Sequence, residues 1–329
     1  SQGSLVFGSK TFFSRNCDSM RNILRIQILF TVALVAISMP FVSTASPPSS
    51  SLRVQGNISV ATEGAGPDII LIPGLASSRD VWADLAARLR PHYRLHLVQV
   101  AGFAGTPALH DQHRQVAAPA AEAIADYIQR EHIRAPVIIG HSLGGEVALM
   151  LGARHPGLAS QLIIVDALPF YTLLFDPAAT SETASPRATA FRTALLATPD
   201  ARMEASQTAT IARLAKNEAV RPSMVSALLA SDRQTVADAT YELMTTDLRP
   251  ELSHIAVPVD VIYAYDALYG VPASQIDALF HAAYAASPQV RFRRIDGSFH
   301  FIMLDQPEIF SRAVLHALEP NRSENSSSP

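Results

Sequence analysis

Short, almost continuous runs of apolar residues recur along the central part of the chain. They are rich in Ile, Val and Leu, which is typical of strands buried on both faces of a parallel sheet. These runs occupy residues 68–72, 95–100, 136–139, 161–165, 257–265 and 289–295. Segments with helical spacing lie between them or follow the last, at residues 80–90, 116–131, 143–155, 272–286 and 306–318. The alternation predicts an α/β fold with a doubly wound, mostly parallel sheet. Residues 58–62 are expected to add an antiparallel edge strand.

The alternation of strands and helices stops after Asp166. Residues 169–254 contain no convincing strand but hold helical stretches rich in Ala, Leu and Met, which prolines separate. These stretches are residues 187–197, 200–216, 219–230 and 232–246, and Pro186, Pro199 and Pro222 are expected to interrupt the helical pattern. We expect residues 169–254 to form a helical lid inserted into a core made of residues 52–168 and 255–319. The alternative is a helical appendage that covers nothing.

The N-terminal part has the pattern of an export signal. Residues 26–52 carry no charge, Arg21 and Arg25 precede them, and a small-x-small cleavage site ends at Ala45. A permanent membrane anchor is the alternative, but the apolar run is short for a span and Pro40 interrupts it. We therefore expect an exported protein, periplasmic or extracellular, with no stable membrane anchor after signal removal. The expected segments are a spurious or added leader at 1–19, a signal peptide at 20–45 and a linker at 46–51.

Charge and cysteine content exclude several classes of protein. The formal net charge of the 329 residues is −3 and no basic patch is visible, so nucleic acid is not an expected partner. The one cysteine, Cys17, lies in the predicted leader, which excludes a disulfide framework and a cysteine nucleophile. Residues 320–329 form a polar Ser/Asn tail of the composition typical of disorder. The sequence leaves the oligomeric state open.

The most informative motif follows the buried run at residues 136–139. Gly140-His141-Ser142-Leu143-Gly144 has the form G-x-S-x-G between a strand and a helix, which is the pattern of a nucleophile elbow. Such a turn holds a serine hydroxyl above the carboxyl edge of the sheet, and its glycines avoid collisions across the turn. We expect Ser142 to be a catalytic nucleophile and His141 to be structural.

A serine nucleophile needs a base, and in folds with this elbow the histidine follows the last strand. His300 stands after the predicted strand at 289–295 and before the helix at 306–318. His281 and His316 lie inside predicted helices and are expected to be solvated. His300 is therefore the expected general base.

The oxyanion hole requires two backbone N–H groups aimed at the developing negative charge. One is expected from Leu143, directly after the nucleophile, since it opens the following helix. The other is expected from the loop after the strand at 68–72, at Leu75 or alternatively at Ala76.

These motifs resemble the α/β-hydrolase superfamily over roughly residues 52–318, and most closely its lidded, single-domain esterases and lipases. Pro73-Gly74-Leu75 is similar to the family's oxyanion loop, with proline in place of histidine. The elbow and the segment 300–307 match the family's elbow and histidine-loop patterns. Superfamily members with an aspartate nucleophile, the epoxide hydrolases and haloalkane dehalogenases, are excluded by Ser142. The resemblance implies a serine hydrolase without a cofactor.

The resemblance also directs the search for the triad acid. The family commonly places it in Gly-x-x-Asp after the strand that follows the lid, and Asp266 stands there. Tyr263-Ala264-Tyr265-Asp266 lacks the glycine and is shifted by about one residue. Some members carry the acid at the end of the strand before the lid, where Asp166 stands. Asp266 is the expected acid and Asp166 the alternative.

Several aromatic residues and histidines are candidates for a substrate pocket or a metal site. Phe170 and Tyr171, next to the strand end at 165, are the expected substrate-binding residues. Phe175, Met203, Met224, Tyr241 and Met244 are further candidates for the pocket lining, and the alternative is that most of these residues pack lid helices against one another. His110 and His113 could bind a metal, but they lie in a loop without a convincing third ligand, so no metal is expected.

The expected activity is hydrolysis of a small or medium apolar carboxylic ester through an acyl-enzyme on Ser142, with a small-molecule ester as partner. Other acyl chemistry on the same triad stays open, on thioesters, lactones, small-peptide amides or carbon–carbon bonds, or in peracid formation. A non-catalytic binding member of the fold is the alternative of a different class, and labelling by a fluorophosphonate would separate it from an enzyme.

Overall fold

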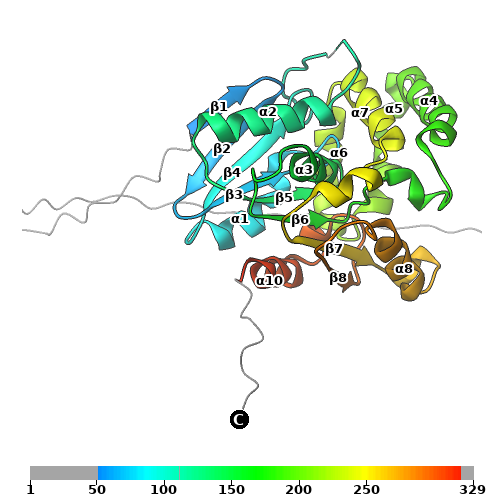
Figure 1. Ribbon diagram of the computed structural model, residues 1–329. Coiled ribbons are helices and arrows are strands. Elements are labelled where there is room, and N and C mark those ends of the chain that lie inside the picture. Colours follow the sequence, from blue (N-terminus) through cyan, green and yellow to red (C-terminus); the bar gives the residue numbers. More distant parts are fainter. Residues whose placement is uncertain (1–50, 111, 320–329) are drawn as a thin grey trace, which may run out of the picture. The chain divides into compact units, whose positions relative to one another are not determined.

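The structure is a computed structural model that describes residues 51–110 and 112–319 (Figure 1). The predicted leader, signal peptide and C-terminal tail lie outside the described residues, as does the predicted linker except for its last residue. Within the described ranges, no helix combines the length and apolarity needed to cross a membrane.

An eight-stranded sheet forms the centre of the fold, in the order β1-β2-β4-β3-β5-β6-β7-β8. From β4 to β8 all neighbouring strands are parallel. The strands are β1 Ser51–Gln55, β2 Ile58–Gly64, β3 Asp68–Ile72, β4 Arg94–Val100, β5 Val137–His141, β6 Gln161–Val165, β7 Val259–Tyr265 and β8 Val290–Asp296. The predicted α/β fold with a mostly parallel sheet is confirmed.

The edge of the sheet differs from the expectation in one respect. The segment predicted as the edge strand is β2, and β1 pairs antiparallel on its outer side. The pattern missed β1 because this strand has no continuous apolar run and both Leu52 and Val54 are exposed. Gly56-Asn57, the two-residue turn between β1 and β2, is a hairpin signal that could have revealed it.

Helices cover both faces of the sheet, because alternate side chains of each central strand point to opposite faces. In β3, Ile70 and Ile72 belong to one buried cluster, while Ile69 and Leu71 belong to the other. The first cluster includes residues of α2 Ala117–Arg130, α3 Leu143–Arg154 and α8 Ala273–Ala283, and the second those of α1 Ala83–Leu89 and α10 Pro307–Leu318 (Figure 1). Two short helices, η1 Arg79–Trp82 and α9 Ile302–Asp305, precede α1 and α10.

A helical insertion separates β6 from β7, as the sequence predicts. It comprises η2 Tyr171–Leu174, α4 Ser181–Ala197, α5 Asp200–Leu214, η3 Glu218–Val220, α6 Arg221–Leu229, α7 Arg233–Thr245 and η4 Arg249–His254. Pro186 was expected to separate segments, but it lies inside α4. The helix begins upstream of the proline because Thr180 and Thr183 form a capping box at its start.

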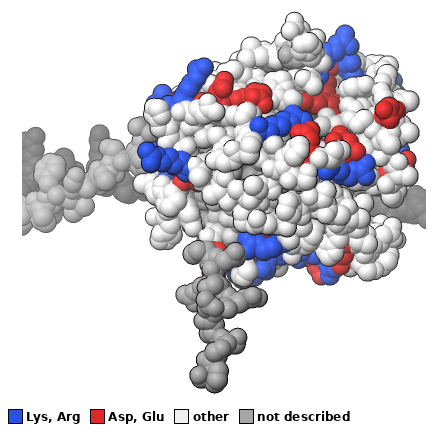
Figure 2. All heavy atoms as spheres, in the orientation of Figure 1, with Lys and Arg blue, Asp and Glu red and all other residues white. Residues whose placement is uncertain are grey.

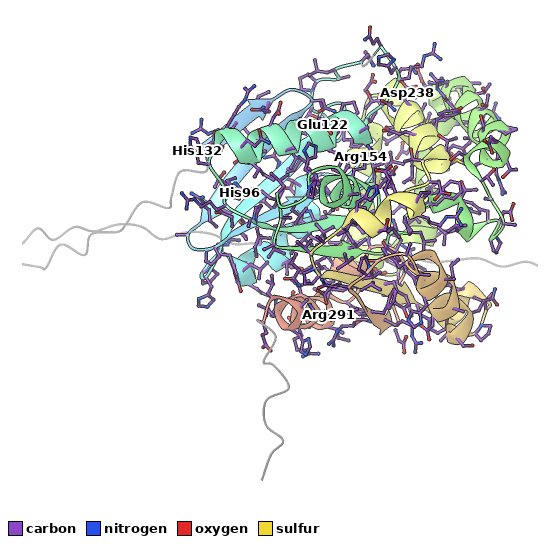
Figure 3. The ribbon with its side chains drawn as sticks, viewed as in Figure 1. His96, Glu122, His132, Arg154, Asp238 and Arg291 are labelled. Carbon is purple, nitrogen blue, oxygen red and sulfur yellow. The ribbon has the colours of Figure 1, made fainter. Side chains whose placement is uncertain are left out.

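Two charged side chains tie the insertion to the core. Arg154, near the end of α3, pairs with Glu251 of η4 at 2.8 Å (Figure 3). Glu242 of α7 is buried, and its carboxylate accepts the N–H groups of residues 116, 117 and 118 at the start of α2, at 2.6, 2.8 and 2.9 Å. A carboxylate in this position satisfies donors that the helix itself cannot pair.

On the face drawn in Figure 2, basic and acidic side chains are interspersed among uncharged ones. This face therefore carries no basic patch of the kind that nucleic-acid binding requires.

Candidate active site

The turn between β5 and α3 has the geometry of a nucleophile elbow. Ser142 follows the last residue of β5 and has φ 55° and ψ −120°, a left-handed backbone that L residues seldom adopt. A Cβ on Gly140 would lie 2.0 Å from the carbonyl oxygen of Gly144, and one on Gly144 would lie 2.3 Å from that of Ile72. The two glycines of the motif are thus required sterically.

Ser142 and His300 line the same cavity, which has a volume of about 370 Å³. The cavity is lined by residues at the strand ends, by residues 74–78, by Asp80 and Val81 of η1, and by residues of α4, α5, α6 and α7 of the insertion. The two residues come from the ends of β5 and β8, so the parallel sheet brings both to its carboxyl edge.

His300 pairs with Asp166, the residue that follows β6. Its Nδ1 lies 2.7 Å from the Oδ2 of Asp166. The other carboxylate oxygen, Oδ1, accepts the backbone N–H of Ala264 in β7 at 2.9 Å. The carboxylate is therefore held by the sheet on one side and fixes the imidazole on the other, with Nε2 left for proton transfer.

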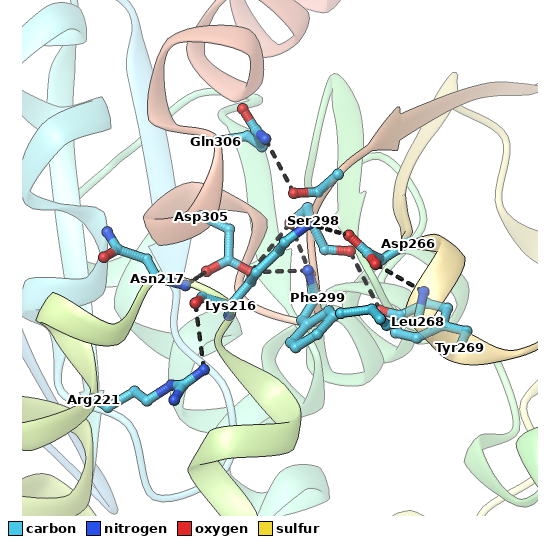
Figure 4. A network of polar contacts seen from close by, with 11 residues as sticks. Lys216, Asn217, Arg221, Asp266, Leu268, Tyr269, Ser298, Phe299, Asp305 and Gln306 are labelled. Carbon is cyan, nitrogen blue, oxygen red and sulfur yellow. Dashed lines mark hydrogen bonds and ion pairs between the residues drawn. The ribbon is translucent and has the colours of Figure 1, made fainter.

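The expectation that Asp266 would hold the histidine is corrected by this geometry. Asp266 is buried after β7, where its Oδ2 lies 2.5 Å from Nζ of Lys216 and its Oδ1 accepts the N–H of Leu268 in η5 Ala267–Tyr269 (Figure 4). The hydrogen bond from Lys216 is the largest influence holding the pKa of Asp266 below its usual range. Lys216 lies in the turn after α5, so the insertion supplies the partner of this aspartate.

The same turn is fastened to the loop that carries His300. The carboxylate of Asp305 accepts the N–H groups of Lys216 at 3.0 Å, Asn217 at 2.9 Å and Phe299 at 2.8 Å (Figure 4). A further bond runs from the N–H of Phe301 to the carbonyl oxygen of Leu214 at 3.1 Å. The histidine loop and the end of α5 thus form one hydrogen-bonded unit.

The predicted oxyanion residues lie around the nucleophile. Leu143 is the first residue of α3, where the backbone N–H has no partner within the helix. Leu75 and its alternative Ala76 both line the cavity, and a Cβ on neighbouring Gly74 would lie 3.1 Å from the Cβ of Ser142. The loop therefore passes close to the serine, as an oxyanion donor must.

The two predicted substrate-binding residues lie in different surroundings. Tyr171 lines the cavity. Phe170 is fully buried and belongs to the apolar core, with the guanidinium of Arg249 5.4 Å from its ring centre. Phe170 therefore packs the insertion against the core and does not face a substrate. Met224 of α6, another of the candidates for the pocket lining, lines the cavity, whereas the prediction missed the residues that α5 supplies.

No group of three or more His, Cys, Asp or Glu side chains in the described part of the chain is arranged to hold a metal ion. His110, a candidate ligand by its sequence, has its Nε2 3.8 Å from a carboxylate oxygen of Asp232.

Known proteins with similar sequences and structures agree with this architecture. The sequence model of the alpha/beta hydrolase family matches residues 69–313. A pimeloyl-(acyl-carrier protein) methyl ester esterase of Aromatoleum aromaticum is 30% identical over 260 residues, which cover 74% of this chain and 94% of that protein. One from Vibrio vulnificus strain YJ016 is 26% identical over 267 residues, with coverages of 77% and 95%.

Among solved structures, the enol-lactonase of Burkholderia xenovorans LB400 superposes with a TM-score of 0.66 at 19% identity, over 82% of this chain and all of that one. At this identity the likeness shows the fold alone. The sequence matches extend over most of the chain and include the elbow, the insertion and the histidine loop. The chain therefore belongs to the alpha/beta hydrolase family, as an esterase-like serine hydrolase.

Proposed function

We propose that the protein hydrolyses neutral carboxylic esters with small or medium apolar acyl groups, through an acyl-enzyme on Ser142. The observation that carries the proposal is the bond of His300 to Asp166, with His300 lining the cavity that also contains Ser142. The esterase names of the relatives support the same reaction type.

The proposed mechanism has two halves. In the first, Ser142 Oγ attacks the ester carbonyl carbon, Nε2 of His300 takes the hydroxyl proton, and the backbone N–H groups of Leu75 and Leu143 bind the oxyanion. The ester C–O bond then breaks and the alcohol leaves with the proton from His300. In the second half, His300 removes a proton from water, which attacks the acyl-enzyme, and the acid departs as Ser142 regains its proton. Asp166 holds the imidazole and stabilises its charged form throughout.

The polar side chains of the cavity support an apolar substrate. Three hydroxyls in its lining already donate to carbonyl oxygens of their own helical segments: Thr210 to Ser206 at 3.0 Å, Ser223 to Val220 at 2.8 Å and Thr240 to Val236 at 2.7 Å. Because these donors are already paired within the protein, they add little polarity to the walls of the cavity.

The charge of the cavity supports an uncharged acyl group. Among the described residues that line it, none is Lys or Arg, and Asp80 is acidic. A free carboxylate in the acyl chain would lose its hydration without gaining a cationic partner, which is costly.

We assign the insertion the role of a lid. Its helices line the cavity together with the strand ends, so substrates would enter past them, and water would be excluded when they close over the acyl group. We also propose that the protein is exported through the signal at residues 20–45. A C-terminally tagged chain expressed with and without these residues should accumulate in the periplasm only with them.

The central test uses purified protein and esters of increasing acyl length. Neutral aliphatic esters should be hydrolysed, and Ser142→Ala should lower turnover by about 10⁶-fold. Labelling by a fluorophosphonate that disappears in Ser142→Ala supports the enzyme. A folded wild-type protein that is neither labelled nor active on any acyl substrate would show it to be a binding member of the fold.

A further inference from the structure

The residue before the nucleophile has contacts that its place in the elbow motif does not explain. His141 is the last residue of β5 and is fully buried at the floor of the cavity. Its Nε2 lies 3.0 Å from the backbone carbonyl oxygen of His300. Because a carbonyl only accepts hydrogen bonds, Nε2 carries the proton and Nδ1 is bare.

Three parts of the site meet at this one imidazole. Its ring centre is 4.5 Å from that of His300 and 4.8 Å from that of Phe301. On its other side, a Cβ at Gly74 of the oxyanion loop would lie 3.1 Å from Nδ1. His141 is also joined by a peptide bond to Ser142. It therefore touches the base and the oxyanion loop while being adjacent to the nucleophile in the chain.

Burying His141 here is energetically unfavourable, which indicates that the residue does more than fill space. Nδ1 of His141 is buried and has no hydrogen-bond partner within the described part of the chain. An unsatisfied buried acceptor destabilises a fold, and an apolar side chain would avoid that loss. Burial, followed by the proximity of His300, holds the pKa of His141 well below its usual range. The ring is thus neutral beside a histidine that becomes positive during catalysis.

The register of the sheet places His141 beside the strand end that carries Asp166. His141 pairs with Val165 across β5 and β6, and Asp166 comes next in the chain. Two neighbouring strand ends therefore hold His300 from two directions. His141 binds its main chain and Asp166 binds its side chain.

We propose that His141 is a positioning residue, whose Nε2–H fixes the main chain of His300 so that the imidazole keeps its place in the cavity during both proton transfers. The inference rests on the proposed function. It assigns His141 no contact with the reacting atoms.

The test compares His141→Gln, His141→Asn and His141→Phe. The amide of glutamine extends as far as Nε2 and can replace its hydrogen bond, whereas asparagine is one methylene shorter and phenylalanine has no donor. A misplaced base typically costs about 10²-fold in rate. We expect kcat to fall by about that factor in the Asn and Phe variants with KM little changed, and to stay within about tenfold of wild type in the Gln variant.

The pH profile is the readout that a merely structural role would not move, and thermal unfolding shows how much of any loss in kcat comes from a loss of stability. The Phe variant should remain folded at the assay temperature while losing kcat, and the Gln variant should keep the acid limb of the kcat/KM profile. Equal kcat in the Gln and Asn variants would overturn the proposal, as would a Phe variant with wild-type kcat. If wild type itself shows no Ser142-dependent labelling or turnover, the proposed function fails instead.

Discussion

The carboxylate of Asp166 holds Nδ1 of His300 at 2.7 Å, although the aspartate lies 134 positions before the histidine in the chain. Asp166 itself has φ 45°, a left-handed backbone, and its N–H donates to the carbonyl oxygen of Ile262 at 2.7 Å. The strand end turns sharply at this residue, and the side chain is held between β7 and the histidine loop.

Asp166→Asn should lower kcat by about 10⁴-fold, since the amide oxygen will keep the Ala264 N–H and present its NH₂ to His300. Nδ1 must then accept, Nε2 carries the proton, and it cannot take one from Ser142. Asp266→Asn is the matched control, and its kcat should stay near wild type because its carboxylate pairs with Lys216. A crippled Asp266→Asn beside an active Asp166→Asn would return the acid to the position predicted from the sequence.

Gly144→Ala should yield little folded protein, because the new methyl would lie 2.3 Å from the carbonyl oxygen of Ile72, which belongs to the rigid sheet. Gly157→Ala is the control: its φ is 83°, but nothing lies within 4 Å of a Cβ there. This control should lose only about 1–2 kcal/mol, the cost of a left-handed alanine. Chemical unfolding of both variants measures the difference, and equal losses would refute the steric argument.

We predict that the free energy of unfolding falls as pH rises, because of Glu146. Burial, followed by the nearby Glu242 carboxylate, raises the pKa of Glu146 well above its ordinary value of 4.5. Between that value and the raised pKa, the folded state binds more protons than the unfolded state. The free energy of unfolding therefore falls as pH rises through this window.

Glu146→Gln removes that proton linkage. Its melting temperature should exceed that of wild type at pH 8, and the two should converge near pH 4. A difference of 1 kcal/mol corresponds to about 2–4 °C in a domain of about 150–250 residues and to less in a larger one. An unchanged pH dependence of melting would show that Glu146 does not release its proton on unfolding.

Asp305→Ala should loosen the joint between the end of α5 and the histidine loop. Three backbone N–H groups lose their acceptor, at a cost of about 1–3 kcal/mol for each that stays buried. Hydrogen exchange at Lys216 and Asn217 should accelerate and kcat should fall. Lys216→Met is the control, because it removes the ion pair with Asp266 and keeps all three backbone N–H bonds to Asp305. Unchanged hydrogen exchange in Asp305→Ala would show that its carboxylate does not hold the end of α5 to the histidine loop.

Ala227→Phe should shorten the acceptable acyl chain. Ala227 lies on α6 and lines the cavity, so a larger side chain would fill part of the space for the acyl chain. We expect kcat/KM for octanoate esters to fall at least tenfold relative to acetate esters, since each lost buried methylene is worth about 0.8 kcal/mol. Parallel losses for both esters would mean that the acyl chain does not lie against α6.

The parts of the fold that repeat a simple pattern could be predicted from the sequence. Buried parallel strands are apolar along their whole length, and the elbow depends on a local collision among Gly140, Gly144 and Ile72 that fixes residue types. Strand β1 escaped because its apolar residues face solvent and only the Gly56-Asn57 turn marks it.

The triad acid could not be chosen by pattern. Asp166 and Asp266 each follow one of two neighbouring parallel strands, β6 and β7, so both reach the same edge of the sheet. Their roles differ through the left-handed turn at Asp166 and through Lys216, which comes from an insertion whose path no local signal reveals. The missing glycine before Asp266 was the one hint that this position differs from the family pattern.

Glu242 has a consequence for engineering. The N-terminus of α2, a helix of the sheet domain, is capped by a carboxylate that belongs to α7 of the insertion. A chimera that replaces residues 169–254 with the corresponding segment of another hydrolase must bring an acid to this point, or α2 will start with open donors. The insertion, which lines the cavity, is therefore also a structural part of the scaffold, and exchanging it alters both.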